Sequence, residues 1–247
     1  MKVIGIIPAR YGSSRFPGKP LALIGDKTMI RRTYERAVQS SLDGVVVATD
    51  DKRIFDEVRN FGGRVVMTSA DHKSGTERCC EALGMIWGNY DAVVNIQGDE
   101  PFIDPRQIDA VADLICLPDV SLATLANPIN DLDRLTNPNV VKVVIDNEGN
   151  ALYFSRQAIP FVRSAEPLQW LDNAQYLQHI GIYAYRSDVL RRIATLAPGR
   201  LEQAESLEQL RWLEHGFKIR VAVTDLNPTY AIDTPDDLHN IPQDLLR

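Results

Sequence analysis

The residues that could do chemistry begin in a basic, glycine-containing loop near the start of the chain. Residues 7–20 follow a short apolar run and include two glycines, two serines and three cations, Arg10, Arg15 and Lys19. Such a loop exposes backbone N–H groups, which favour an anion. Its guanidinium and ammonium groups suit the several oxygens of a polyphosphate. The alternative is a solvated basic loop whose glycines serve only its turns.

This loop matches neither of two common phosphate-binding motifs. A P-loop has four residues between its first glycine and a Gly-Lys pair that Ser or Thr follows. Here five residues separate Gly12 from Gly18, and Pro20 follows Lys19. The dinucleotide fingerprint Gly-x-Gly-x-x-Gly does not occur in the sequence either. A kinase or an NAD-dependent reductase is therefore disfavoured.

Two aspartates, each after a short apolar run, could hold a metal ion. Asp99 follows the run 92–96 and Gly98, whereas Asp233 stands immediately before Thr-Pro. Magnesium takes oxygen ligands and is usually held by one or two carboxylates together with substrate phosphates. The pair Asp99 and Asp233 is thus a candidate magnesium site. The alternatives are a turn residue at Asp99 and a helix N-cap at Asp233.

Alternating strands and helices are expected to position this loop and Asp99. Apolar runs rich in valine and isoleucine are typical of buried strands, and they occur at 3–7, 45–48, 64–67 and 92–96. Helical spacing fills the intervals at 29–41, 52–61 and 76–87. This order favours a Rossmann-like α/β fold, a mostly parallel sheet with helices on both faces. Ligands of such sheets bind outside the carboxyl ends of the strands.

The rhythm changes after residue 121 to closely spaced strands. They predict a small strand-rich, antiparallel lobe over about 121–186, with strands at 121–126, 140–145, 151–155 and 179–185. Later elements are expected to be helices at 187–196 and 201–215, a strand at 218–223 and a helix that starts at 233–235. The stretch 164–175 is the expected mobile loop. Because no linker separates two units, residues 1–247 are expected to form a single α/β domain that includes the lobe.

Composition limits the class of protein. A chain of 247 residues with 45% hydrophobic and 24% charged residues is ordinary for one large globular domain. Its formal net charge of −6 argues against a nucleic-acid surface. The first apolar run is interrupted by Pro8 and Arg10, and no stretch approaches the roughly 20 apolar residues of a membrane span. We therefore expect a cytoplasmic protein with no nucleic-acid partner and no membrane insertion.

Several blocks spread over nearly the whole chain carry a family resemblance. The most specific are Ser74-Gly75-Thr76-Glu77-Arg78, Phe154-Ser155-Arg156 and the stretch 205–211, in this order. The others lie at 7–10, 17–21, 48–50, 71–73, 97–101, 137–144, 151–153, 179–186, 201–204 and 233–235. Together they resemble the 3-deoxy-manno-octulosonate (Kdo) cytidylyltransferase family. The departures are small: Phe16 stands where the family commonly has leucine, and the stretch 164–175 varies.

The resemblance implies an enzyme that transfers CMP from CTP to the sugar acid Kdo with Mg²⁺. It implies a homodimer built through the strand-rich lobe that serves lipopolysaccharide synthesis in the cytoplasm. The implied catalytic residues are Lys19, Asp99 and Asp233, of which Asp99 and Asp233 hold the metal. The implied nucleotide-binding residues are Pro8, Ala9, Arg10, Ser13, Arg15, Lys19, Asp71, Ser74, Arg78 and Gln97. The implied sugar-binding residues are Gln97, Arg156, His179, Tyr183, Glu208 and Gln209.

Elementary chemistry is consistent with these roles and leaves alternatives open. A guanidinium such as that of Arg156 can bind the carboxylate of a sugar acid in a fork. A hydroxyl-rich sugar needs mixed donors and acceptors, which Gln97, Glu208 and Gln209 provide. His179 could instead be a satisfied core histidine, and Glu208 could be a solvated acid.

Two rival functions follow from the same residues. One is a cytidylyltransferase for another acidic sugar, such as a sialic acid or 8-amino-Kdo, because a pocket accepts a small change at modest cost. The other is a non-catalytic nucleotide-binding or regulatory module, which the presence of both Asp99 and Asp233 disfavours.

Overall fold

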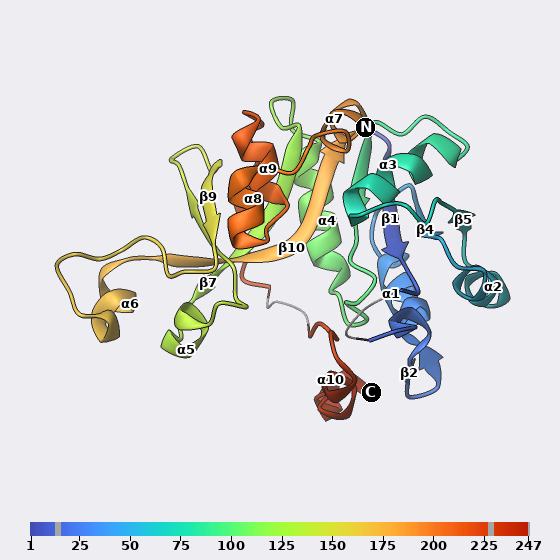
Figure 1. Cartoon of the computed structure of the whole chain (residues 1–247), viewed down its shortest axis with the longest axis horizontal. Helices are drawn as coiled ribbons and strands as arrows, with labels where there is room; N and C mark the ends of the chain where they lie inside the picture. The colour runs from blue at the N-terminus through green and yellow to red at the C-terminus, as the bar shows by residue number, and fades with distance from the viewer. Residues whose placement is uncertain (13–15, 227–229, 247) are drawn as a thin grey trace.

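The valine- and isoleucine-rich runs pair into one large sheet. In the computed structural model, which describes residues 1–12, 16–226 and 230–246, its main path is β11-β7-β10-β6-β1-β4-β5, and β8 and β9 attach beside β10 (Figure 1). The strands are β1 Val3–Ala9, β4 Gly44–Thr49, β5 Val65–Met67, β6 Ala92–Asn95, β7 Leu122–Ile129, β8 Lys142–Ile145, β9 Ala151–Ser155, β10 Tyr176–Arg186 and β11 Arg220–Val223. A separate small hairpin joins β2 Leu23–Ile24 to β3 Lys27–Thr28.

Most neighbouring strands of the main path are parallel. Strand β1 runs parallel to both β4 and β6, β4 to β5, and β11 to β7. Strand β10 is the exception and runs antiparallel between β6 and β7. The predicted Rossmann-like, mostly parallel α/β sheet is thus confirmed. Its parallel strands end on the side where the basic loop follows β1.

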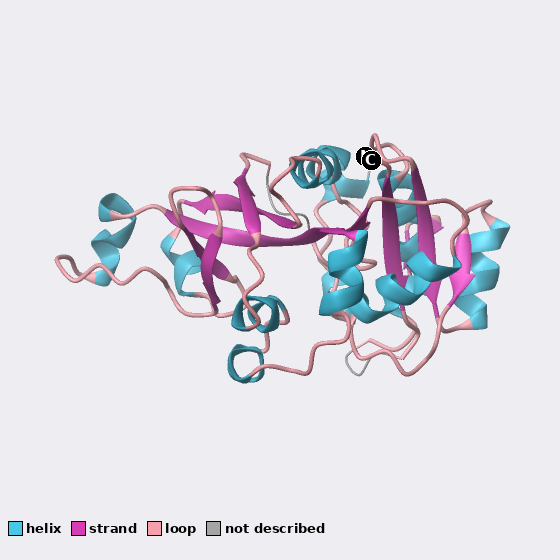
Figure 2. Cartoon of the chain, turned by 90° about the horizontal axis from the view of Figure 1, so that it is seen from above, coloured by secondary structure: helices cyan, strands magenta, loops and turns pink. Residues whose placement is uncertain are grey.

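Helices cover both faces of the sheet, as Figure 2 shows for the view along it. Alternate side chains of β1 enter opposite cores: Ile6 packs with one set of helices and Ile7 with the other. The core of Ile7 contains residues of α1 Met29–Ala37, α2 Lys52–Asn60 and α4 Pro105–Ile115. The core of Ile6 contains residues of α3 Gly75–Met85, α7 Ser187–Ile193 and α9 Gln209–Glu214.

The strand-rich lobe is an extension of the main sheet. The first half of β10 pairs with β7 and β8, whereas its last residues pair with β6 in the main sheet. A bulge between Ile180 and Tyr183 separates the two halves. The Thr124 hydroxyl stabilises this bulge by donating its one proton to the Ile182 carbonyl (2.7 Å), with the Ile180 carbonyl also within reach at 3.2 Å. The lobe also carries two short helices, α5 Leu132–Thr136 and α6 Trp170–Asn173.

Three elements differ from the sequence expectation. The helix expected at 201–215 is two helices, α8 Arg200–Glu205 and α9, because Ser206 between them adopts a left-handed conformation with φ 53°. The stretch 164–175 contains α6 and a 3-10 turn, Pro167–Gln169. Helix α4 was not expected, although Asp104 caps it and Pro105 begins it, which is a common helix start.

The end of the chain folds back beneath the main sheet. Helix α10 Pro235–His239 and the 3-10 turn Gln243–Leu246 lie near the lower end of β1 in Figure 1. Across the described residues, no helix has the length and apolar character needed to cross a membrane.

Candidate functional site

The loop after β1 closes on itself and delivers Lys19 to the edge of the sheet. The Gly18 N–H donates to the Tyr11 carbonyl at 2.9 Å. Gly18 has φ 72°, and a side chain there would meet the Tyr11 ring at 3.0 Å, so glycine fits both the conformation and the space. The 3-10 turn Lys19–Leu21 follows at once. Ser13 and Arg15, two predicted phosphate ligands of this loop, lie outside the described residues.

Asp99 reaches the same place from the end of β6. The chain passes so close to β1 that a Cβ on Gly98 would lie 2.9 Å from the Pro8 carbonyl oxygen, which explains the glycine. One residue later, the Asp99 carboxylate accepts a hydrogen bond from the Lys19 ammonium, with an Nζ–Oδ2 distance of 2.6 Å. Two segments that follow different strands therefore meet through one ion pair.

Asp233 joins this ion pair from the C-terminal segment. Its carboxylate lies 3.1 Å from Lys19 Nζ, although the two residues are 214 positions apart. The Ile232 N–H donates to the Asp99 carbonyl at 3.1 Å, and the Ile232 side chain is buried with Ile24 and Met29. The predicted convergence of Lys19, Asp99 and Asp233 is what the structure contains.

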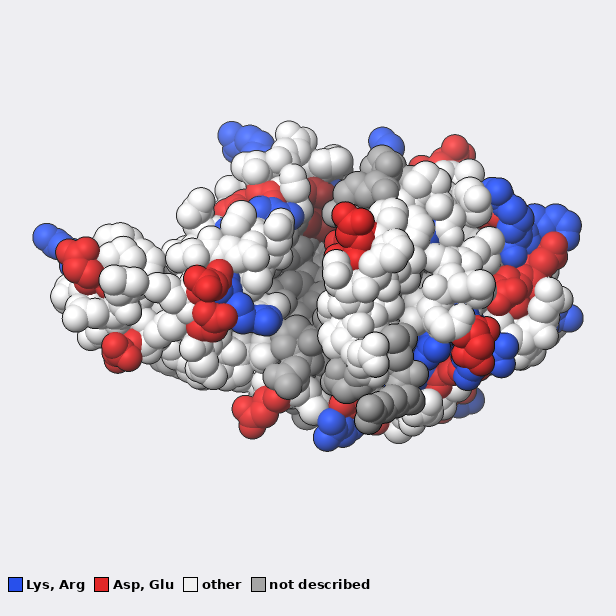
Figure 3. Space-filling view, turned by 90° about the horizontal axis from the view of Figure 1, so that it is seen from below, with Lys and Arg blue, Asp and Glu red and all other residues white. Residues whose placement is uncertain are grey.

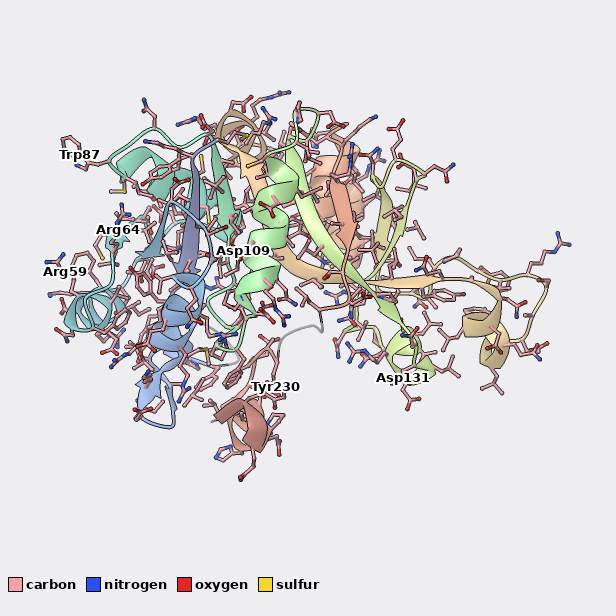
Figure 4. All side chains as sticks on the ribbon, turned by 180° about the vertical axis from the view of Figure 1, so that it is seen from behind. Arg59, Arg64, Trp87, Asp109, Asp131 and Tyr230 are labelled. Carbon is pink, nitrogen blue, oxygen red and sulfur yellow. The ribbon has the colours of Figure 1, made fainter. Side chains whose placement is uncertain are left out.

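Helix α10 fixes the backbone on either side of Asp233. The Thr234 side chain caps the helix and accepts from the Asp237 N–H, while the Asp237 carboxylate accepts from the N–H groups of Asp233 (2.8 Å) and Thr234 (2.7 Å). Burial alone would raise the pKa of Asp237, but these N–H groups lower it. Thr234 is the cap, so the Asp233 side chain has another use. Figure 4 shows this segment, with Tyr230 labelled at its start.

A cavity of about 260 Å³ opens beside the three charged groups. Among the predicted nucleotide-binding residues, Pro8, Ala9, Arg10, Lys19, Ser74, Arg78 and Gln97 line it. The other lining residues are Pro20, His72, Lys73, Gly75, Gly98, Asp99 and Asp233. Asp71 does not line it and is exposed, with its N–H and carboxylate bonded to the Ser69 hydroxyl.

The amino end of α3 forms one wall of this cavity. Ser74 caps the helix by accepting from the Glu77 N–H, and Gly75 lies so close to β1 that a Cβ would meet Pro8 Cγ at 3.2 Å. A helix N-terminus presents unpaired N–H groups and positive potential, which suit an anion. Together with Arg10, Lys19 and Lys73, this wall makes the cavity a site for an anion next to two carboxylates.

Arg78 organises the wall from inside the protein. Its side chain is only 3% exposed, and its guanidinium donates to the Thr68 hydroxyl (2.6 Å), the Ser69 carbonyl (3.1 Å) and the Asp50 carboxylate (2.8 Å). These bonds tie the segment after β5 to the end of β4. Most of the N–H donors of Arg78 are therefore used in hydrogen bonds within the protein. Its role in binding the base stays a prediction.

His72 is a lining residue that the sequence reasoning missed. Its Nε2 is hydrogen-bonded to the Glu81 carboxylate, and its Nδ1 lies 3.8 Å from the Glu77 carboxylate. The Ser69 N–H donates to Glu81 at 2.8 Å and, with His72, holds the pKa of that carboxyl below its usual range. The available signal was its position two residues before the Ser74 cap.

The predicted sugar-binding residues other than Gln97 do not line this cavity. In Figure 3, which views the molecule from below, acidic and basic side chains are interspersed over this face. His179 belongs to an aromatic group on the lobe side, packed edge-on against Phe154 and close to the Tyr183 ring. Burial lowers its pKa to about 3, so the ring is neutral near pH 7.

Tyr183, Glu208 and Gln209 lie at the junction of β10, α3 and α9. Tyr183 packs against Trp212 at 5.1 Å between ring centroids, and Gln209 is buried. Glu208 accepts a hydrogen bond from the Thr76 hydroxyl at 3.0 Å. Burial raises the pKa of Glu208, although bonds from Ser74 and Thr76 act against this. Glu208 is therefore a largely buried acid and not the solvated acid that the sequence left open.

Arg156 clamps two segments of backbone. Its guanidinium donates from Nε to the Glu205 carbonyl (2.7 Å), from Nη1 to that of Pro138 (3.0 Å) and from Nη2 to that of Ser206 (3.4 Å). A guanidinium has five N–H donors, so two remain beyond these contacts. The predicted fork with a sugar carboxylate is neither formed nor excluded by this arrangement.

The residues at Lys19 could supply part of the ligand set of a magnesium ion, namely the carboxylates of Asp99 and Asp233. No cluster of three or more histidine, cysteine, aspartate or glutamate side chains that could hold a metal occurs among the described residues. Asp99 and Asp233 supply two carboxylates, and a magnesium ion there would need further oxygen ligands.

Known proteins with similar sequences are cytidylyltransferases. The chain matches the model of a family described as Cytidylyltransferase over residues 4–219. A 3-deoxy-manno-octulosonate cytidylyltransferase of Bacteroides thetaiotaomicron is 55% identical over 96% of this chain and 96% of its own. Another from Syntrophobacter fumaroxidans is 50% identical over 98% of this chain and 96% of its own.

Solved structures give the same picture. A CMP:2-keto-3-deoxy-manno-octonic acid synthetase complexed with CTP is 43% identical and has a TM-score of 0.89, covering 98% of this chain and 97% of its own. A cytidylyltransferase from Leptospira borgpetersenii, 21% identical with a TM-score of 0.61 over 96% of this chain and 83% of its own, shares the fold.

Proposed function

The chain belongs to the 3-deoxy-manno-octulosonate cytidylyltransferase family, and we propose that it transfers CMP from CTP to Kdo, giving CMP-Kdo and pyrophosphate. The observation that carries this proposal is the convergence of Lys19 with Asp99 and Asp233 beside the anion-binding end of α3. Relatives that are at least 50% identical over nearly their whole length carry the name of this activity.

The reaction is a displacement at phosphorus. The oxygen of the anomeric C2 hydroxyl of Kdo forms a bond to the α-phosphorus of CTP. The bond from that phosphorus to the oxygen bridging the α- and β-phosphates breaks, its electron pair leaves with pyrophosphate, and the hydroxyl proton is released. Both reactants are anions, so alignment and charge neutralisation dominate the barrier.

The residues of the cavity are placed to supply these effects. We assign Arg10 and Lys19 to the triphosphate, because both line the cavity and have basic side chains. The N–H groups at the start of α3 bind the anion without adding a mobile charge. Ser74, Gln97 and the backbone of Pro8–Ala9 are assigned to the nucleotide for the same reason of position.

We propose that Asp99 and Asp233 hold Mg²⁺. The donor set fits this ion, because two carboxylates already face one cation, the Lys19 ammonium, and magnesium is commonly held by one or two carboxylates plus phosphates. When bound, the ion would neutralise phosphate charge and polarise the attacking hydroxyl. The two carboxylates are insufficient alone, so the protein should bind magnesium tightly only together with CTP.

The sugar acid is assigned to the side of the molecule where β10 meets the start of α9. Gln97 lines the nucleotide cavity and is assigned to both substrates. We propose that Arg156, through its remaining donors, takes the Kdo carboxylate, and that His179, Tyr183, Glu208 and Gln209 contact the sugar. Nε2 of the neutral His179 ring lies 3.0 Å from the Thr124 hydroxyl, which leaves Nδ1 for one hydrogen bond with a sugar hydroxyl.

The biological setting is also a proposal. The family assignment supports a cytoplasmic enzyme of lipopolysaccharide synthesis that acts as a homodimer through the strand-rich lobe at about 121–186. Exposed apolar side chains on that lobe, including Leu152 at 61% and Phe161 at 72%, are consistent with such self-association.

A coupled assay of pyrophosphate release tests the function. With CTP and magnesium, Kdo should give rapid turnover, while a sialic acid and 8-amino-Kdo should react more slowly. A faster reaction with either analogue would identify the enzyme as a cytidylyltransferase for another acidic sugar. Tight CTP binding without turnover on any acceptor would instead support a regulatory module.

A further inference from the structure

A set of buried polar side chains links the metal-binding loop to the lobe side of the molecule. The Asn95 side-chain amide, at the end of β6, donates to the Tyr185 hydroxyl at 3.4 Å. That hydroxyl also interacts with Thr76, and the Thr76 hydroxyl donates to the Glu208 carboxylate at 3.0 Å. Asn95, Thr76 and Tyr185 are each at most 3% exposed. Such networks hold their members in one arrangement, because an unmade bond in the interior is costly.

Thr76 is the member that joins the two halves of the proposed site. It lies in the first turn of α3, directly after Ser74 and Gly75, which line the nucleotide cavity. Its partner Glu208 precedes α9, next to Gln209, and is 132 residues away in the sequence. One hydroxyl thus connects the nucleotide-binding end of a helix to an acid assigned to the sugar.

Thr76 can act only through another group. Its side chain is 1% exposed and does not line the cavity, so it cannot touch a substrate in this arrangement. The Glu208 carboxylate depends on it for a hydrogen bond, because burial raises the pKa of Glu208 and the bonds from Ser74 and Thr76 lower it. Removal of the hydroxyl would leave the carboxylate with one donor fewer in a mostly buried place.

We propose that Thr76 is a positioning residue, which holds the Glu208 carboxylate in the orientation that Kdo binding requires and thereby fastens the sugar side of the site to the amino end of α3. The inference rests on the proposed function, because it assigns Glu208 to the acceptor sugar. Thr76 itself takes no part in the chemistry.

Steady-state kinetics of Thr76→Val, which keeps the shape and removes the hydroxyl, test this role. We expect the KM for Kdo to rise about tenfold, the order of one lost hydrogen bond to a charged group. The KM for CTP should stay within twofold. Thr76→Ser, which restores the hydroxyl, should bring the KM for Kdo back to within twofold of the unchanged protein. Thr76→Ala is a second hydroxyl-free variant to use if the valine variant does not fold.

Ser187→Ala is the matched control. Ser187 is buried and its hydroxyl donates to the Tyr90 carbonyl at 2.6 Å, beyond the end of β10 that is distant from Lys19. Its removal should lower stability without changing either KM. Equal rises of both KM values in Thr76→Val, or no rise, would overturn the positioning role.

A double substitution and a titration separate this role from general damage. In a Glu208→Gln background, Thr76→Val should cause no further rise in the KM for Kdo, since its effect runs through the Glu208 carboxylate. The pKa of Glu208, followed by carbon NMR of the labelled carboxyl, should be higher in Thr76→Val than in the unchanged protein. An unchanged pKa would refute the inference whatever the acceptor is. Absence of CMP-Kdo formation by the unchanged protein would instead refute the proposed function.

Discussion

Replacement of Asp99 by asparagine should abolish turnover and leave the fold intact. The substitution keeps the shape of the side chain and removes its charge. In the structure this charge faces the Lys19 ammonium at 2.6 Å, at the wall of the nucleotide cavity. The backbone carbonyl that receives the Ile232 N–H is unaffected, so the C-terminal segment should stay in place.

The two consequences differ in size. At an effective dielectric constant of about 20, a pair of unit charges 2.6 Å apart attracts with about 6 kcal/mol before desolvation and screening. Because the Asp99 side chain is 30% exposed and Lys19 keeps Asp233, the net loss of stability should be below about 1 kcal/mol. The loss in kcat should be about 1,000-fold or more, which corresponds to about 4 kcal/mol of transition-state stabilisation.

Pyrophosphate release at saturating CTP and Kdo measures kcat, and thermal unfolding checks the fold. Magnesium with CTP should raise the Tm of the unchanged protein and have a much smaller effect on Asp99→Asn, whereas magnesium alone should leave both nearly unchanged. Asp109→Asn is the control, because Asp109 lies on α4 (Figure 4), does not line the cavity, and accepts hydrogen bonds from the Ser41 N–H and hydroxyl. A folded Asp99→Asn protein with kcat within tenfold of the unchanged enzyme would refute the metal assignment.

Three further outcomes follow from single positions. Gly98→Ala should lower kcat at least tenfold and Tm by several degrees, because the new Cβ would lie 2.9 Å from the Pro8 carbonyl oxygen. Gly84→Ala is the control and should slightly raise Tm, because Gly84 lies in α3 with open space around it. Equal effects of the two substitutions would contradict this prediction. Lys142→Met should lower the free energy of unfolding, measured with urea, by about 2–4 kcal/mol, because the buried ammonium donates to three backbone carbonyls. A loss under about 1 kcal/mol would show that these carbonyls find other hydrogen-bond donors. Burial lowers the pKa of His179 to about 3, so between pH 6.5 and 3 the unfolded chain binds a proton on this imidazole and the folded chain does not. The free energy of unfolding should therefore fall as the pH is lowered from 6.5 towards 3, by less than about 1.4 kcal/mol per pH unit. His179→Gln should make this fall less steep, and an unchanged slope would contradict the prediction.

The main sheet and the basic loop could be predicted because their signals are local. Buried parallel strands need apolar side chains on both faces, and the runs at β1, β4 and β6 show this directly in their composition. The loop that carries Lys19 follows the first run without interruption, so its place at the carboxyl edge follows from topology alone. The cavity also contains most of the nucleotide-binding residues that the family resemblance implies.

The sugar side was less predictable because it depends on contacts between distant segments. The left-handed Ser206 splits an apparently continuous helix, and Glu208, just after the split, accepts a hydrogen bond from Thr76. The donors of Arg156 are directed at carbonyls that the sequence does not reveal. An arginine, an acid and a histidine in the sequence thus indicate possible ligands, whereas their burial and partners decide how many donors remain for a substrate.

The convergence of Asp99 and Asp233 depends on a minor core rather than on the main sheet. Ile232 packs with Ile24 and Met29, and the hairpin β2–β3 that carries Ile24 directly follows the Lys19 turn. The same short region of sequence therefore positions the ammonium and anchors the segment that brings the second carboxylate to it. This explains why Asp233 contacts Lys19 although the two residues are 214 positions apart. The C-terminal segment packs on the hairpin that follows the Lys19 turn, so the position of Asp233 depends on how the N-terminal loop and hairpin fold.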